Sequence, residues 1–174
     1  MKLWLARYKY RGSERLAPLI GQMTMFGYEQ LRRVWAGAGR SDARIVLSYV
    51  PLSARRLEER GFNQSEAIAR IVASRYRVPV VPLFVRTRHT EKQSYKSRRE
   101  RMESLHQAFS ADPRGVADIL GLTRGGTQIN LVLVDDVYTT GSTLQHCGET
   151  AMFAMAPLVS KMIDLRIYGL TWAR

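Results

Sequence analysis

A run of four aliphatic residues, Leu131–Val134, stands between Asn130 and the acid pair Asp135-Asp136. A strand with one solvent face would alternate apolar and polar residues, but every position of this run is apolar. Such a run is typical of a strand in a parallel sheet that other elements cover on both faces. It therefore predicts an α/β fold, with an open, mostly parallel sheet and helices on both sides.

Apolar periodicity predicts the elements around this strand. Helices are expected over 14–35, 58–76 and 142–155, and strands over 44–50, 78–85 and 163–172. Segment 97–107 is a weaker helix candidate, after which Phe109 would return the chain to the core. Strands separated by helices indicate right-handed crossover connections between parallel strands.

With 174 residues, the chain has the length of a single domain, which we expect to span residues 1–174. Segment 86–101 interrupts the pattern because it carries seven Lys and Arg residues and its first half has no apolar periodicity. We predict a flexible basic loop there.

The charge balance favours anionic partners. Lys and Arg number 27 against 15 Asp and Glu, so the formal net charge is +12. A single cysteine, Cys147, excludes an intramolecular disulfide and paired-cysteine zinc sites, which fits a reducing compartment. The longest apolar stretch, 151–159, is too short to span a membrane, and no secretion signal is evident, so we expect a cytoplasmic protein without a membrane partner.

The acid pair is the first candidate for a ligand site. Ligands of open parallel sheets bind at the carboxyl ends of the strands, where Asp135 and Asp136 are expected. Two adjacent carboxylates repel each other, and either a ribose diol that donates hydrogen bonds to them or a magnesium ion would offset this cost. We therefore predict that they bind the diol of a sugar phosphate.

The residues that follow supply hydroxyl groups and backbone N–H groups at the expected start of a helix. They are Thr139, Thr140, Gly141, Ser142 and Thr143. Unpaired N–H groups and the positive end of the helix dipole attract a phosphate, so we predict a 5′-phosphate site here. A simple helix cap would explain Ser142 or Thr143 but would leave the acid pair without a purpose.

Segment 132–143, Val-Leu-Val-Asp-Asp-Val-Tyr-Thr-Thr-Gly-Ser-Thr, resembles the phosphoribosyl pyrophosphate signature of the type I phosphoribosyltransferases. The resemblance implies the fold of that family and binding of phosphoribosyl pyrophosphate with magnesium. It also implies transfer of phosphoribose to a nitrogenous acceptor, with inversion at ribose C1. In purine-salvage members an acid lies three residues after the second carboxylate, where this chain has Thr139, so the catalytic residue is not assigned.

Segments 60–64 and 93–109 resemble the competence protein F (ComF) family, which includes the GntX-like proteins. Some members take part in DNA uptake, and relatives often form dimers. Many also carry a four-cysteine zinc module before the transferase domain, which we expect to be absent here. Ser104 replaces the usual Asn of the family.

The resemblance also suggests roles for other residues. Residues 1–40 would form the hood over the acceptor pocket, and residues 86–101 the loop that closes over the site. The pyrophosphate-binding candidates are Ser53, Arg55 and Arg56, for which a solvated basic turn is an equal alternative; the loop candidates are Arg88, Gln93, Lys96 and Arg98.

Two functions follow. The first is magnesium-dependent transfer of phosphoribose from phosphoribosyl pyrophosphate to an unidentified acceptor. The second is a competence factor that binds single-stranded DNA and retains a non-catalytic ribose-phosphate site. Either protein could be a homodimer.

Within the helix expected at 142–155, adjacent His146 and Cys147 face different sides, which argues against a shared metal site. The methionines Met152, Met155 and Met162 are expected to pack in the core.

Overall fold

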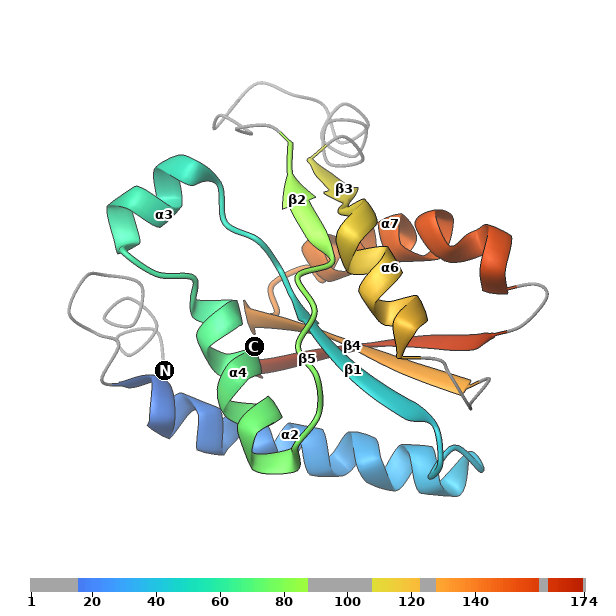
Figure 1. Ribbon diagram of the computed structural model, residues 1–174. Coiled ribbons are helices and arrows are strands. Elements are labelled where there is room, and N and C mark those ends of the chain that lie inside the picture. The colour runs from blue at the N-terminus through green and yellow to red at the C-terminus, as the bar shows by residue number, and fades with distance from the viewer. Residues whose placement is uncertain (1–15, 88–107, 123–127, 160–162, 174) are drawn as a thin grey trace.

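A parallel three-stranded sheet is the centre of the fold. The computed structural model describes residues 16–87, 108–122, 128–159 and 163–173. Its elements are the helices α2 (Ala17–Gly37), α3 (Ala54–Arg60), α4 (Gln64–Tyr76), α6 (Pro113–Gly121) and α7 (Ser142–Val159) and the strands β1 (Arg44–Tyr49), β2 (Phe84–Arg86), β3 (Phe109–Ala111), β4 (Gln128–Val137) and β5 (Asp164–Ala173). The sheet has the order β1-β4-β5, and β2 pairs with β3 in a separate antiparallel ribbon (Figure 1). The predicted α/β fold is confirmed.

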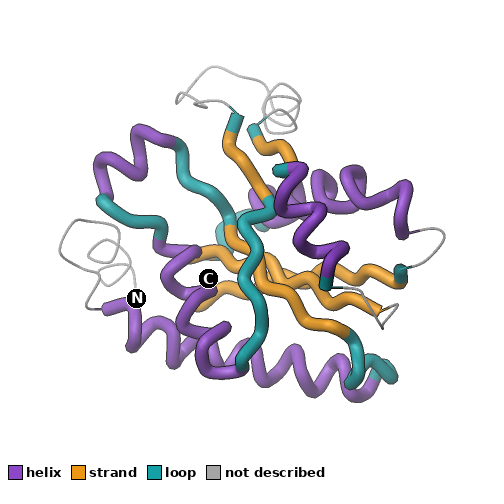
Figure 2. The backbone as a smooth tube through the Cα atoms, viewed as in Figure 1, coloured by secondary structure: helices purple, strands orange, loops and turns teal. Residues whose placement is uncertain are grey.

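Helices cover both faces of this sheet. In Figures 1 and 2, α2 and α4 lie on one side of it, and α6 and α7 lie on the other. The side chains of β4 alternate between two cores: Leu131 and Leu133 belong to the core with α6 and α7, and Val132 and Val134 belong to the core with α2 and α4. Burial on both faces explains why this strand is apolar at every position.

The prediction of one continuous helix over 58–76 is wrong, because the structure has two helices there, α3 and α4. Gly61 ends α3 in a left-handed conformation, with φ of +84°, which glycine adopts without a steric penalty. Asn63 then starts α4, since its side-chain oxygen accepts hydrogen bonds from the backbone N–H groups of Ser65 and Glu66 at 3.0 and 3.3 Å.

The strand predicted over 78–85 is also wrong. Only Val80 forms a bridge beside β1, to Leu47, and the chain then turns away into β2. Pro79 and Pro82 lie in this stretch and have no backbone N–H to donate, so a regular ladder cannot form through them.

The predicted helices over 14–35 and 142–155 and the strands over 44–50 and 163–172 agree with the structure within a few residues at their ends, whereas the helix candidate over 97–107 lies outside the described residues. Phe109 is buried, as expected, but it begins β3, and neither β3 nor α6 was predicted. α7 is longer than expected and contains Pro157. β4 also extends beyond its apolar run to include the acid pair.

A buried arginine ties the end of α2 to the sheet. The Arg40 guanidinium donates hydrogen bonds to Asn130 Oδ1 at 2.8 Å and to the carbonyl oxygens of Ile129 and Asp164 at 3.0 Å each. It also pairs with the Asp164 carboxylate. Helix and sheet are thereby joined at the end remote from the acid pair.

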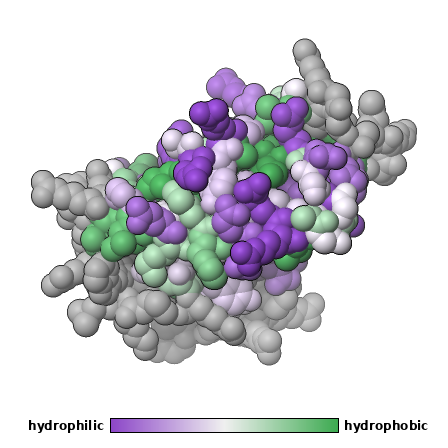
Figure 3. Space-filling view, turned by 90° about the horizontal axis from the view of Figure 1, so that it is seen from below, coloured by the Kyte–Doolittle hydropathy of each residue, from purple (hydrophilic) through white to green (hydrophobic). Residues whose placement is uncertain are grey.

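Figure 3 looks onto the α2 side of the molecule, where hydrophobic side chains are exposed between hydrophilic ones. Leu19, Met23 and Phe26 of α2 are among the exposed apolar residues, and Phe26 is 71% exposed. Within the described ranges, no helix has both the length and the apolar character needed to cross a bilayer.

Candidate functional site

The acid pair lies in the last part of β4, where the strand still pairs with β5. Asp135 is opposite Thr171 and Val137 opposite Ala173. Because side chains alternate along a strand, Asp135 and Asp136 leave β4 on opposite faces. Both are half-buried, so their carboxylates remain accessible at the carboxyl end of the sheet.

The start of α4 positions Asp135. Ser65 Oγ donates a hydrogen bond to Asp135 Oδ1 at 3.1 Å, and the backbone N–H of Asp136 donates to the same oxygen at 2.9 Å. Asn63 holds α4 in place, since its Nδ2 donates to the carbonyl oxygen of Val50 at 3.0 Å. The end of β1, the start of α4 and the acid pair therefore form one connected unit.

Two arginines lie close to this unit. Burial lowers the pKa of Arg86, the last residue of β2, and the nearby positive charge of Arg56 lowers it further. Asp135 acts in the opposite direction. The Arg86 guanidinium also lies over the Phe109 ring, 5.3 Å from its centroid. The site thus combines two cations with the acid pair. Cations attract the anionic groups of a ligand, and carboxylates accept hydrogen bonds from its hydroxyl groups.

The pyrophosphate-binding candidates differ in what their side chains do. Ser53 is buried and caps α3, since its Oγ accepts a hydrogen bond from the Arg56 N–H at 3.4 Å. Arg55 is exposed and pairs with Glu59 at 2.9 Å. Of the three, only Arg56 is an electrostatic neighbour of Arg86 and so belongs to the acid-pair region.

The predicted phosphate loop connects β4 to α7. Its Gly141 has φ of +77°, and a Cβ atom there would lie 2.6 Å from the Tyr138 hydroxyl oxygen, so the turn requires glycine. Thr140 Oγ1 lies 2.9 Å from Ser142 Oγ and 3.4 Å from the Ser142 N–H. Thr139 and Thr140 are exposed, and Ser142 and Thr143 open α7. Hydroxyl groups and first-turn N–H groups therefore gather at one helix end.

The remaining candidates, Arg88, Gln93, Lys96 and Arg98, lie outside the described residues, as does the basic segment beyond Thr87. Arg86, which was expected to begin that segment, is part of β2.

His146 and Cys147 are both buried in α7 and do not share partners. His146 Nδ1 contacts the Ser142 carbonyl oxygen, whereas Cys147 packs in the core with α6. Burial raises the pKa of the Cys147 thiol to about 12, and the Asp135 carboxylate contributes in the same direction.

The residue types at the acid pair fit a magnesium ion, which prefers carboxylate and phosphate oxygens and keeps part of its water shell. Asp135 and Asp136 supply such oxygens at the surface. In the described part of the chain, no group of three or more His, Cys, Asp or Glu residues could hold a metal ion.

Sequence analysis assigned no role to Ser65 or Asn63, and it placed Arg86 only as the first residue of the basic loop expected over 86–101. The stretch Gly-Phe-Asn-Gln-Ser at 61–65 carried a usable signal, because a glycine followed by Asn at a helix start is typical of a stop and a cap. No comparable signal marked Arg86, which reaches the site only through the folded arrangement of β2 and α3.

A comparison with known proteins shows similarity to a bacterial competence protein. Competence protein ComFC of Bacillus subtilis (strain 168) is 33% identical to it over 151 residues. The match covers 86% of this chain and 52% of the relative, so the chain spans about half the length of that protein. No family model matches the chain, and no solved structure matches it significantly. The similarity to Competence protein ComFC supports a relationship of this chain to the ComF family.

Proposed function

We propose that this chain binds phosphoribosyl pyrophosphate with magnesium at the carboxyl end of β4 and transfers its phosphoribosyl group to a nitrogenous acceptor. The observation that carries the proposal is the order of groups along one short segment. Asp135 and Asp136 come first, and Gly141 with its hydroxyl neighbours follows at the start of α7. A ribose diol and a terminal phosphate on one ligand would match these two features.

In the proposed reaction, a nitrogen atom of the acceptor forms a bond to ribose C1 and the bond from C1 to the pyrophosphate oxygen breaks. The acceptor nitrogen loses its proton, and pyrophosphate leaves with the bonding electrons. Bound magnesium would offset the charge on the leaving pyrophosphate. Arg86 and Arg56 would stabilise the same charge, because Arg86 interacts electrostatically with Asp135 and Arg56 lies near Arg86.

The first test is calorimetric titration of phosphoribosyl pyrophosphate, with and without magnesium, into the full chain. We expect micromolar binding that requires magnesium. The double variant Asp135→Asn, Asp136→Asn should bind at least about tenfold more weakly, since hydrogen bonds to charged groups contribute about 1.5–3 kcal/mol each.

The matched control is Asp118→Asn, which removes an exposed carboxylate from α6 and should leave the affinity unchanged. Equal binding by the double variant and the wild type would contradict the assignment of the diol site. Release of pyrophosphate on addition of an acceptor distinguishes a transferase from a protein that only binds the sugar phosphate.

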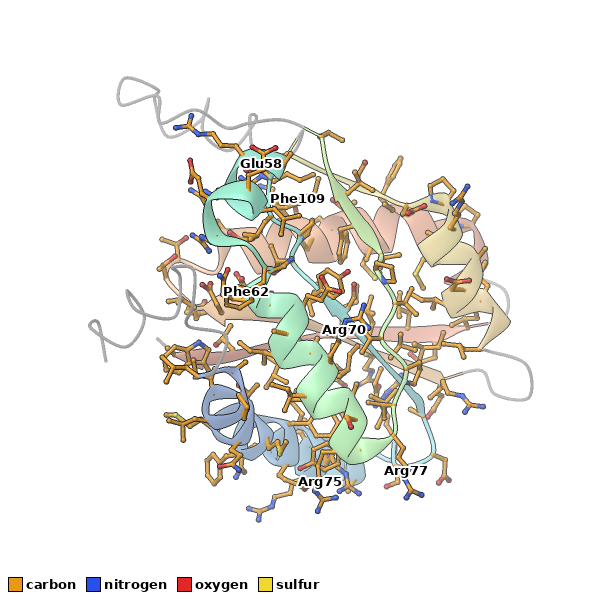
Figure 4. All side chains as sticks on the ribbon, turned by 60° about the vertical axis from the view of Figure 1, so that its left-hand side comes forward. Glu58, Phe62, Arg70, Arg75, Arg77 and Phe109 are labelled. Atoms are coloured by element: carbon orange, nitrogen blue, oxygen red, sulfur yellow. The ribbon has the colours of Figure 1, made fainter. Side chains whose placement is uncertain are left out.

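A second function, binding of single-stranded DNA, is favoured by a different observation. The relative bears the name Competence protein, and this chain has a net charge of +12. Figure 4 shows Arg70 and Arg75 along α4 and Arg77 beyond its end, with Arg75 and Arg77 at the end remote from α3. Arg75 and Arg77 therefore lie at the opposite end of α4 from Ser65, which contacts the acid pair.

The two functions predict different responses. DNA binding through α4 should weaken when Arg75 and Arg77 are both changed to Ala, and its affinity should fall steeply with salt. The same change should leave sugar-phosphate binding intact. DNA affinity that depends instead on Asp135 and Asp136 would contradict binding through α4.

A further inference from the structure

A pocket of about 570 Å³ lies between α7 and β5, on the core side of the sheet that contains Leu133. Its size is within the range of roughly 300–1,000 Å³ that is typical of small-molecule sites. Its lining includes Tyr138, Gln145, Gly148, Glu149, Met152 and Ile167.

This pocket is distinct from the acid-pair region. It shares Thr140 and Gly141 with the loop before α7, but its described lining does not include Asp135, Asp136, Arg56 or Arg86. Asp135 instead interacts with Ser65 at the start of α4. A ligand here would therefore be bound by the outer edge of the sheet, and its binding does not depend on the proposed function.

The apolar part of the lining suits a flat ring. Tyr138 and Met152 are 40% and 43% exposed, so both present apolar surface to the pocket. Met152 was expected to pack in the core, and that expectation is wrong. Aromatic rings stack on planar ligands, and a methionine thioether makes favourable contacts with aromatic edges.

The polar part of the lining carries a negative charge. Gln145 Nε2 donates a hydrogen bond to Glu149 Oε1 at 2.9 Å, which orients the carboxylate one turn along α7. An ionised carboxylate accepts about four hydrogen bonds through its two oxygens, so it can also accept from a ligand amino group. The charge disfavours a phosphate in the pocket itself.

Gly148 opens the wall of the pocket on α7. A Cβ atom there would approach only the Ile167 methyl carbon Cγ2, at an ordinary 3.9 Å. Gly21 of α2 differs, since its Cβ would lie 2.5 Å from Ile71. Glycine inside a helix costs about 1 kcal/mol relative to alanine, and close packing does not explain this cost at Gly148. The absence of a side chain there instead enlarges the pocket.

We propose that this pocket binds a planar heteroaromatic amine of nucleobase size, with its ring against Tyr138 and Met152 and its amino group donating to Glu149. A free nucleoside with an exocyclic amine has this chemistry.

The test uses adenosine as the probe, titrated into the full chain labelled with ¹³C-methyl methionine and followed by NMR. The Met152 signal, identified by its loss in Met152→Leu, should shift saturably. Inosine, which has a carbonyl oxygen where adenosine has the amine, should bind more weakly because it cannot donate to Glu149 from that position.

Two variants test the contacts. Gly148→Leu fills the pocket and should weaken adenosine binding by more than about tenfold. Its control is Gly37→Leu, at the end of α2, where a Cβ atom meets nothing within 4 Å. If Gly148→Leu fails to fold, Glu149→Gln retains the volume and should bind adenosine about fivefold more weakly, since charged hydrogen bonds are roughly twice as strong as neutral ones.

Ribose 5-phosphate separates this pocket from the phosphate loop. The Met152 shift should persist when ribose 5-phosphate saturates the chain, because the phosphate would bind at the start of α7 and the adenosine ring against Tyr138 and Met152, although Thr140 and Gly141 border both sites. The proposal is overturned if adenosine produces no saturable shift at Met152, if inosine binds equally well, or if ribose 5-phosphate displaces adenosine. Binding of phosphoribosyl pyrophosphate is measured separately, so failure of either proposal leaves the other intact.

Discussion

Asp135 interacts with groups from three different parts of the chain. Its carboxylate accepts from Ser65 on α4, and its charge acts on both Arg86 of β2 and Cys147 of α7. Burial and this negative charge together raise the pKa of Cys147 to about 12. The thiol therefore stays protonated at physiological pH and is not a nucleophile there.

This raised pKa predicts a loss of stability in alkaline solution. The thiol of the unfolded chain ionises near pH 9, but that of the folded chain ionises only near pH 12. The thiol of the unfolded state thus loses its proton first, which favours unfolding. The contribution of the thiol to the free energy of unfolding is therefore complete below pH 9 and falls as pH rises from 9 to 12, by up to about 1.4 kcal/mol per pH unit.

Urea unfolding at pH 8, 9 and 10 checks this expectation. In Cys147→Ala, the free energy of unfolding should decline less between pH 9 and 10 than in the wild type. The comparison stops at pH 10 because burial raises the pKa of Tyr28 from 10.0 to about 12, so Tyr28 also affects stability above that pH. An unchanged slope in Cys147→Ala would contradict the assignment.

At the scale of elements, α6 shows how closely helix and backbone pack. A Cβ atom at Gly115 would lie 2.7 Å from the Pro82 carbonyl oxygen and 2.9 Å from the Leu83 Cα. Both are backbone atoms, which cannot rotate away as a side chain does. At Gly121, in the same helix, a Cβ atom would meet nothing within 4 Å.

These two glycines form a matched pair for mutation. Alanine normally stabilises a helix by about 1 kcal/mol relative to glycine, so Gly121→Ala should be neutral or stabilising. Gly115→Ala should instead lower the free energy of unfolding by about 1–3 kcal/mol, as overpacking does. Thermal and urea unfolding of both variants measure the difference, and stabilisation by Gly115→Ala would refute the close packing.

The elements also show what sequence reasoning can predict. The apolar run of β4 indicated the parallel sheet because burial on both faces removes alternation, and the acid pair and loop followed from their positions after that run. The break between α3 and α4 was missed because apolar spacing continues across it while Gly61 changes the backbone direction. Arg86 was predicted only as the start of the basic loop, because its interaction with Asp135 depends on where the β2–β3 ribbon packs, which local sequence pattern does not indicate.

At the scale of the whole molecule, Arg40 joins α2 to two strands. It is 2% exposed, and its partners are Asn130 at the start of β4 and Asp164 at the start of β5. A buried cation with several hydrogen-bond partners is expensive to disrupt, because its partners lose their donors without gaining water.

Arg40→Ala should therefore lower the free energy of unfolding by about 3 kcal/mol or more. The control is Arg33→Ala on α2, an exposed residue whose loss should change stability by less than about 0.5 kcal/mol. Urea denaturation with both variants makes the comparison. Similar stability of Arg40→Ala and the wild type would show that the network does not hold α2 to the sheet.

The central position of β4 has a consequence for biosynthesis. β4 pairs with both neighbouring strands and contributes to both cores, and it follows β1, α2 and α4 in the chain. Until residues 128–137 have been synthesised, β1 lacks the strand β4 with which it pairs. The apolar surfaces of α2 and α4 then also lack the side chains of Val132 and Val134, against which they pack. Neither helix layer can therefore close on a complete sheet before residues 128–137 have been synthesised.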